Sequence, residues 1–482
     1  MRQAFHILKK DARFLRLEIS LLCVLSMFYG WAATRMANSI PIQVVLGIAA
    51  AYVIACLVHA ETIPGNQQFW VTRPYRRSSL MVAKLLGLLL FVNLPILAAR
   101  LYVLGRSNFP LTDAVGALMW SQLLLFLGGM LPVAALAAVT SGLVPFLFTV
   151  LVLVAVVLGV DASIAPPSAS AVRLTLSASQ WVWNSIVVLT LVSLSVPVLL
   201  LQYRARRTWL SRWVIGCVVL GGIAAYVYVP WPVAAAVQSR LSPRRYPEGA
   251  VELRMEPEAR RFFERGMMRQ GGVQVDVPVA VRGLGPDVEV IPDAVSLTFQ
   301  RADGRIWSTG PYGYAAIAKQ APGQGDALLN ADVDLPQEFF DGAVRQRVGL
   351  KAVYYLTLFG SGQASTIAAQ STPVPVSGGL QCWLGAFHML TCASMYRWPN
   401  RIVYAQFGGG LVPFTRAISY SPFPAGMNLY SFEVRQVSST PGAQKVTIVQ
   451  KEVLAHLRQE FVVEDFPLRR MSVEIRGTSR RE

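Results

Sequence analysis

Long apolar stretches alternate with short polar connections through the first half of the chain. Seven of these stretches are close to the length of about 20 residues that a helix needs to cross a bilayer. They lie near residues 17–36, 42–60, 80–102, 114–138, 143–162, 180–201 and 212–234. Only Thr140, Ser141 and Gly142 separate the fourth stretch from the fifth, so two half-length segments are the alternative there. The pattern predicts an α-helical membrane domain of about six or seven spans over residues 17–236.

The second half has a different period. From residue 271 apolar and polar residues alternate, as they do along a strand with one buried face. The alternation is clearest in VQVDVPVAV, AVSLTF and MSVEI, and further strand-like runs are GLKAVYYLTLF, RIVYAQF, LYSFEVRQV and KVTIVQ. Glycine, proline and polar clusters separate these runs. The pattern predicts an all-β, sandwich-like region over residues 271–482, either one large sandwich or two smaller ones divided near 373–379. We expect a helical connector over residues 237–270.

The first 16 residues have a helical period of their own. At 100° per residue, an apolar stripe of Ala4, Phe5, Leu8, Ala12 and Leu15 lies opposite the basic side chains. A basic amphipathic helix of this kind lies in the membrane interface, with its charges toward anionic headgroups. Residues 1–16 are therefore expected to form an interfacial helix. The alternative is a topology signal with no later role.

Charge fixes the expected orientation. The chain has a net charge of +17, of which +12 belongs to residues 1–236 and +5 to residues 237–482. Its basic residues flank the apolar stretches instead of lining one soluble face, which argues for membrane orientation and against nucleic-acid binding. A cytoplasmic N-terminus places 13 Lys and Arg on the inner side and 4 on the outer side, counted along residues 1–236. After seven spans, the C-terminal domain would lie outside the cytoplasm.

Cysteine placement agrees with this orientation. Cys23, Cys56 and Cys217 fall within apolar stretches, where a thiol behaves as a small apolar group. Cys382 and Cys392 fall in the expected external domain, where an oxidising compartment favours a disulfide between them. Two buried free thiols are the alternative.

The sequence carries few signs of catalytic chemistry. It has no G-x-x-x-x-G-K-[ST] phosphate-binding loop, so it lacks that route to ATP hydrolysis. His388 lies between Cys382 and Cys392, but the spacing matches no usual zinc pattern. Asp332 and Asp334 lack the dense spacing of a calcium loop and are interpreted as solvated turn residues. We therefore expect no metal site, no catalytic residue and no cofactor bound by this chain.

One polar connection stands out, between the second and third apolar stretches. The segment QQFWVTRPYRRSSLMVAKLL, residues 67–86, combines basic side chains with aromatic rings. Proline suits the first turn of a helix, so Pro74 predicts a short helix running into the third span. Aromatic residues and arginine are enriched at protein interfaces. The alternative is a basic anchor with an aromatic belt.

These residues resemble a known family. The arrangement Glu61-x-x-Pro-Gly, Phe69-x-x-Thr-Arg-Pro-x-x-Arg and Leu80-x-x-Ala-Lys-Leu-Leu is similar to the cytosolic loop of type-2 ATP-binding-cassette (ABC) exporter permeases. The family also begins with an interfacial amphipathic helix, and the resemblance covers residues 1–235. Two features depart from it: the family core has six spans, and a large external β domain is not a general family feature.

The resemblance implies a multi-pass subunit of the bacterial cytoplasmic membrane. It would pair with a second permease copy or a homologous permease and with a cytosolic ABC ATPase that binds ATP and Mg²⁺. The ATPase-coupling residues carried over by position are Glu61, Phe69, Trp70, Arg73, Pro74, Arg76, Arg77 and Lys84. The competing hypothesis is a membrane-anchored sensor whose external β domain binds a ligand. A membrane-embedded enzyme is the weakest hypothesis, since the apolar stretches hold almost no ionisable residues.

Overall fold

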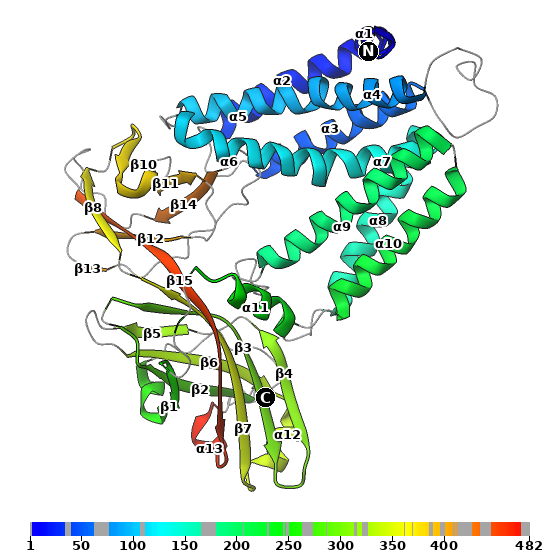
Figure 1. Cartoon of the computed structure of the whole chain (residues 1–482). Coiled ribbons are helices and arrows are strands. Elements are labelled where there is room, and N and C mark those ends of the chain that lie inside the picture. Colours follow the sequence, from blue (N-terminus) through cyan, green and yellow to red (C-terminus); the bar gives the residue numbers. More distant parts are fainter. Residues whose placement is uncertain are drawn as a thin grey trace, which may run out of the picture.

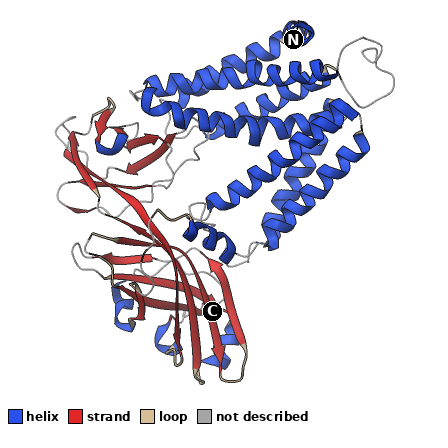
Figure 2. Ribbon diagram, in the orientation of Figure 1, coloured by secondary structure: helices blue, strands red, loops and turns tan. Residues whose placement is uncertain are grey.

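The computed structural model has a helical N-terminal region followed by a β-rich C-terminal region (Figures 1 and 2). It describes residues 2–33, 40–61, 77–106, 111–164, 180–205, 207–228, 231–243, 246, 250–262, 273–285, 287–312, 316–320, 326–360, 362–368, 370–384, 389–395, 401–407, 410–411, 427–433 and 445–473.

Each predicted apolar stretch is helical over the residues that the structure describes, although the last, 212–234, is divided between two helices. The α-helices of this region are α1 (Arg2–Phe14), α2 (Arg16–Ala33), α3 (Ile40–His59), α4 (Arg77–Gly87), α5 (Leu94–Arg106), α6 (Leu111–Leu124), α7 (Leu131–Val139), α8 (Leu143–Ile164), α9 (Gln180–Leu200), α10 (Thr208–Tyr228) and α11 (Trp231–Arg240). The π-helical segments η2 (Leu88–Asn93) and η3 (Leu125–Met130) join α4 to α5 and α6 to α7, and η4 (Leu201–Ala205) extends α9. The break at residues 140–142 lies between α7 and α8, as predicted.

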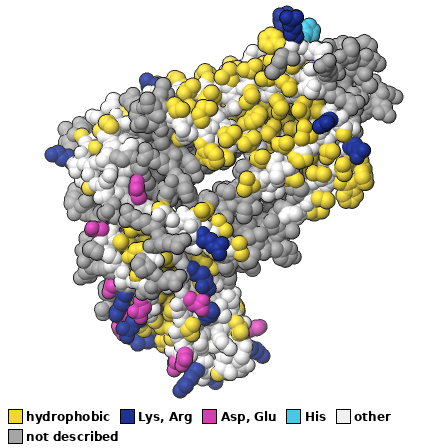
Figure 3. Space-filling view, in the orientation of Figure 1, with side chains coloured by type: hydrophobic (Ala, Val, Ile, Leu, Met, Phe, Trp, Pro, Cys, Tyr) yellow, Lys and Arg dark blue, Asp and Glu magenta, His cyan; other side chains and the backbone are white. Residues whose placement is uncertain are grey.

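Four helical stretches of the described residues are long and apolar enough to cross a membrane. They are Arg16–Ala33, Pro41–His59, Ser78–Arg106 and Ala114–Val139. Shorter apolar stretches lie in α8, α9 and α10. Large apolar side chains such as Leu21, Val24 and Phe148 are exposed on these helices. Hydrophobic side chains cover much of the described surface of the helical region in Figure 3. An exposed apolar surface of this extent indicates a membrane protein.

Two of the four arginines assigned to the outer connections, Arg100 and Arg106, lie on a helix. Arg100 is on α5, where it is 3 % exposed, and its Nη1 donates a hydrogen bond of 3.1 Å to the Ser121 hydroxyl on α6. Arg100 therefore contacts α6 from within α5 and does not lie in a connection.

The β-rich region has strands at the predicted runs, although LYSFEVRQV and MSVEI are described as strand only in part, and all its described pairings are antiparallel. One sheet has the order β1 (Glu252–Met255), β2 (Val273–Arg282), β6 (Ala327–Leu335) and β5 (Ala316–Gln320), with β16 (Ser472–Val473) beside β2. A second has the order β14 (Met427–Glu433), β11 (Met389–Met395), β10 (Leu380–Leu384) and β9 (Val374–Val376). The third has the order β13 (Gly410–Leu411), β12 (Arg401–Phe407), β15 (Lys445–Val463), β7 (Val348–Phe359), β3 (Glu289–Arg301) and β4 (Ile306–Tyr312), with β8 (Gln363–Ala368) beside β15.

Two hydrophobic cores lie in this region, and β15 borders both. The larger core holds the alternating valines of β2 together with Leu297 and Phe299 of β3. The smaller core holds Ile367, Leu380 and the β15 residues Val446 and Ile448. The N-terminal half of β15 pairs with β12 and β8, and its C-terminal half pairs with β7. Among the described residues, the change from the larger core to the smaller one therefore falls between β7 and β8, ahead of the predicted division at 373–379.

Three local expectations are corrected. The connector over 237–270 is not wholly helical, because residues 252–255 form β1, held to β2 by backbone pairing with Leu253 buried. A 3-10 turn at Pro257–Phe262 follows it, and the short helices α12 (Gln337–Ala343) and α13 (Leu468–Met471) lie further along the chain. Asp332 and Asp334 are on strand β6 and not in a turn. Of the segment MSVEI, Met471 ends α13 and only Ser472 and Val473 are described as strand.

Helix α11 ties the helical region to the β-rich region through His456 of β15. The ring Nδ1 lies 2.8 Å from the Thr357 hydroxyl on β7 and 3.0 Å from the Gln238 amide on α11. The hydroxyl of Thr357 donates in turn to Asp293 Oδ2 over 2.5 Å. A second tie follows, since the backbone N–H of His456 donates to Ser242 Oγ over 3.0 Å.

A second junction lies between the α5–α6 hairpin and the sheet that carries β10 and β11. Val103, Leu104, Ala114 and Leu118 form one buried cluster with Ala393 of β11. The β-rich region is thus held against the helices at two places (Figure 1).

Candidate functional site

The predicted coupling loop is described only at its two ends. Glu61 is described directly after α3, and α4 begins at Arg77. Phe69, Trp70, Arg73, Pro74 and Arg76 lie outside the described residues, as does the side chain of Arg77. A helix does run from this segment into the third apolar stretch, as α4, η2 and α5. The site is therefore built from what surrounds the two ends of the loop.

Helix α1 packs against α4, with its buried face rotated from the predicted stripe. Ala4, Ile7, Leu8 and Asp11 are buried, whereas Phe5 is 67 % exposed. The spacing of four, seven, eight and eleven is still that of one helical face. The rotation places the Asp11 carboxylate inward, where it meets a lysine of α4.

Four ionic side chains meet where α1, α3 and α4 converge, and we call them the ion cluster: Lys10, Asp11, Glu61 and Lys84. Lys84 Nζ donates to Asp11 Oδ2 over 2.7 Å and lies 3.4 Å from Glu61 Oε2. Lys10 Nζ donates to Glu61 Oε1 over 2.7 Å. The two carboxylates therefore share Lys84, and Lys10 adds a second positive charge beside Glu61.

The interior of the ion cluster is shielded from solvent. Asp11 is 0 %, Lys84 3 % and Glu61 4 % exposed. Burial raises the pKa of the Asp11 carboxyl, although the Lys84 ammonium opposes the rise. Burial also acts to raise the pKa of Glu61, but Lys84 and Lys10 outweigh it and hold that pKa below its ordinary value. Glu61 is thus the firmly ionised carboxylate, and Asp11 is the more easily protonated one.

The ion cluster fixes both ends of the 62–76 segment to one helix. Glu61 immediately precedes the segment, Lys84 lies two turns into α4, and both are bonded to side chains of α1. The described residues on either side of the loop are therefore both held to α1, and separating the buried Lys84–Asp11 pair would be costly.

Sequence reasoning found two members of the ion cluster and missed two. Glu61 and Lys84 came from the family resemblance, as residues framing the loop. Asp11 was missed, although it is the single acidic residue among the first 17, in a segment otherwise rich in Lys and Arg. That isolated acid on a basic helix is the signal that would have suggested an inward-facing partner for a lysine. Lys10 was assigned only to the headgroup-facing side.

The predicted disulfide is present. Cys382 on β10 is bonded to Cys392 on β11, and the two residues are register partners in the antiparallel pair. Both are 0 % exposed and belong to the smaller β core. The alternative of two free thiols is contradicted. Cys23, Cys56 and Cys217 are free.

Replacing both residues, as Cys382→Ala with Cys392→Ala, is expected to lower the free energy of unfolding by about 2.5 kcal/mol. The reason is the lost closure of a short loop in the unfolded chain. Denaturant unfolding without reductant measures the change. Cys217→Ala is the matched control, and equal stability of the double variant and this control would contradict the expectation.

No group of three or more metal-ligating side chains occurs within the described part of the chain. His388 lies outside that part. In the His456 junction the Thr357 proton is directed at Asp293, so the imidazole is not placed to remove it. Comparison with known proteins adds no family: no protein-family model matches the chain, and no curated protein matches it. What stands is a membrane-type helical region joined to a β-rich region, with a buried ion cluster at the convergence of α1, α3 and α4.

Proposed function

We propose that this protein is the membrane permease subunit of an ABC-type exporter, driven by a separate cytosolic ATPase. The observation that carries the proposal is the ion cluster, which braces both ends of the loop between α3 and α4 against α1. A subunit driven from outside needs a loop whose displacement reaches the helices, and the cluster provides that link.

In this proposal seven helical spans cross the membrane: α2, α3, α4–α5, α6–α7, α8, α9 and α10. The basic N-terminal helix and the 62–76 loop lie in the cytoplasm, following the bias of Lys and Arg. An odd number of spans then places the β-rich region, as a sandwich-like domain, outside. The Cys382–Cys392 disulfide supports this side, because disulfides persist in oxidising compartments.

The loop residues divide into two roles. Phe69, Trp70, Arg73, Pro74, Arg76 and Arg77 form the contact surface for the ATPase, which binds ATP and Mg²⁺ itself. Glu61 and Lys84 are almost fully buried, so they brace the surface instead of touching the partner. A second permease copy, or a homologous permease, completes the assembly.

Alanine at Arg73, Arg76 and Arg77 together is expected to abolish recovery of the ATPase with the purified protein. Arginine at such surfaces supplies several directed hydrogen bonds, which alanine removes. The measurement is purification from native membranes in mild detergent, followed by mass spectrometry for a subunit carrying G-x-x-x-x-G-K-[ST].

The matched control replaces three arginines outside the loop, Arg2, Arg13 and Arg16, which are exposed at α1 and the start of α2. It removes equal charge from the same side of the membrane and is expected to retain the ATPase. Retention by the loop variant as well would overturn coupling through this loop. Recovery of a soluble ligand of the β-rich region, with no ATPase, would instead favour the sensor hypothesis.

A further inference from the structure

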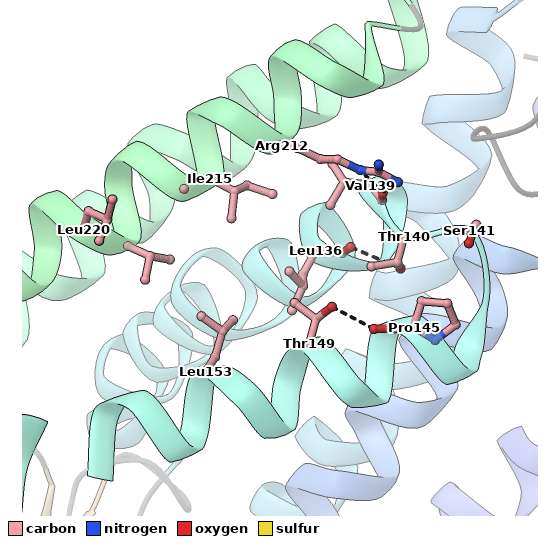
Figure 4. A pocket seen from close by; sticks show the side chains of 12 residues that line it. Leu136, Val139, Thr140, Ser141, Pro145, Thr149, Leu153, Arg212, Ile215 and Leu220 are labelled. Carbon is pink, nitrogen blue, oxygen red and sulfur yellow. Dashed lines mark hydrogen bonds between the residues drawn. The ribbon is translucent and has the colours of Figure 1, made fainter. Parts of the chain in front are cut away.

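A cavity of about 430 Å³ lies between α8 and α10, with the end of α7 as its floor (Figure 4). Its walls come from regularly spaced faces of two helices. Pro145, Thr149 and Leu153 repeat every four residues along α8. On α10 the lining residues are Arg212, Ile215, Gly216, Val219 and Leu220, the spacing of one helical stripe. A volume of this size is typical of a small-molecule site.

The cavity is polar at one end and apolar along the rest. Arg212, Thr140 and Ser141 gather at the polar end, while Ile215, Leu153 and Leu220 lie farther along (Figure 4). The Thr149 hydroxyl donates to the Pro145 carbonyl oxygen over 2.7 Å, so this side chain is satisfied within its own helix. Arg212 carries the only charge among the twelve described residues that line the cavity.

Arg212 has donors to spare. Its Nε and Nη2 each donate to the Val139 carbonyl oxygen over 3.2 Å, which satisfies one of the open carbonyls at the end of α7. A guanidinium has five N–H donors, so two such bonds leave three for a ligand. The capping role alone would not require a cavity beside the residue.

The polar end lies on the same side of the molecule as the ion cluster. His59 lies two residues before Glu61. Its ring Nε2 is 2.9 Å from the Ala137 carbonyl oxygen and 3.1 Å from the Thr140 hydroxyl, which belongs to the polar end. Trp209 and Trp213, on either side of Arg212 along α10, are 72 % and 58 % exposed. Exposed tryptophans at a helix end are typical of the headgroup level of a bilayer.

We propose that this cavity binds one anionic phospholipid of the cytoplasmic leaflet, with its phosphate at Arg212 and an acyl chain along the α8–α10 groove. The proposal rests on the membrane placement given above, though not on the ATPase. Charge selects the occupant, since a lone cation with free donors favours a phosphate. Shape agrees, because the stripe from Arg212 to Leu220 gives about 12 Å of apolar wall.

Gly216 leaves the space that the acyl chain fills. A Cβ at this position would meet nothing within 4 Å. Helical side chains tilt toward the helix N-terminus, so a leucine here would cover the wall toward Arg212. Gly221 is equally open on α10 but does not line the cavity. Gly216→Leu and Gly221→Leu therefore form a matched pair that leaves the charge unchanged.

The test is native mass spectrometry of the full chain, purified in detergent with equal amounts of phosphatidylglycerol and phosphatidylcholine. We expect the native protein and Gly221→Leu to retain one phosphatidylglycerol per chain in preference to phosphatidylcholine. Gly216→Leu should lose it, and Arg212→Gln should weaken retention by about tenfold. Arg207→Gln removes an exposed charge near the same helix end and should weaken retention far less.

Equal retention by Gly216→Leu and Gly221→Leu would overturn the site. So would equal retention of the two lipids by the native protein, because the charge at Arg212 would then select nothing. ATPase recovery is measured in the same preparations. Loss of preferential lipid retention while the ATPase is still recovered would refute the lipid site alone. Absence of the ATPase from the native preparation, with lipid retention unchanged, would refute the permease proposal alone.

Discussion

Lys84→Met is expected to lower the free energy of unfolding by about 3–5 kcal/mol. The substitution removes the ammonium that Asp11 and Glu61 share and leaves two buried carboxylates close together. An unpaired buried charge is far more costly than the pair was favourable, so the loss is large for a single side chain. Chemical unfolding in detergent, followed by tryptophan fluorescence, measures it.

Two further variants make this expectation specific. Lys9→Met, at an exposed position on α1, removes the same charge and should change stability by less than about 0.5 kcal/mol. Adding Asp11→Asn and Glu61→Gln to Lys84→Met removes both carboxylates and should recover most of the loss. If Lys84→Met is as stable as Lys9→Met, the ion cluster does not hold α1 to α4.

Stability is also expected to fall by about 3 kcal/mol between pH 6.5 and pH 4, through His456. Burial lowers the pKa of this imidazole to about 4, whereas an unfolded histidine has a pKa of about 6.5. The unfolded chain therefore binds more protons in this window. The stabilisation is fully present above pH 6.5 and is lost as pH falls toward 4. Asp293 is the carboxylate on the other side of Thr357.

The difference between the native protein and His456→Asn isolates this contribution. Asparagine keeps a short polar side chain but does not titrate, so the variant should show a shallower decline in unfolding free energy on acidification. Unfolding curves at pH 7.5 and pH 4.5 measure both slopes. Parallel slopes would mean that His456 does not govern the acid response of the α11 junction.

The fold was largely predictable because the hydrophobic periodicity of most segments indicates whether each is a helix or a strand. The valines of β2 alternate strictly, and all five are buried in one core. Residues 252–255 were misassigned because four residues are too few for a period to decide, and their pairing with β2 decides it instead. The pairing of β15 with strands of two different cores could not be predicted from periodicity either, because one continuous strand pairs with elements far apart in sequence.

The candidate sites were less predictable because they depend on tertiary orientation. The rotation of α1 against α4 decides whether Asp11 faces the lipid headgroups or Lys84. The apolar stripe alone predicted the wrong rotation. The stripe from Arg212 to Leu220 is visible in the sequence, but the cavity exists only because α8 and α10 both pack beside the end of α7. His456 had no local signal at all, since its side-chain partners lie on α11 and β7, far away in sequence.

The position of β15 along the chain sets an order of assembly. Strands β3, β7, β8 and β12 all precede it in synthesis, yet in the described strand pairings β8 and β12 join β7 and β3 through β15. Both β cores therefore stay incomplete until residues 445–463 have left the ribosome. The earlier strands must wait with unpaired edges, which are prone to aggregation. A chain released by a ribosome that stalls before residue 445 should therefore be unable to complete either β core. Dependence on chaperones should be greatest while residues before 445 are being synthesised.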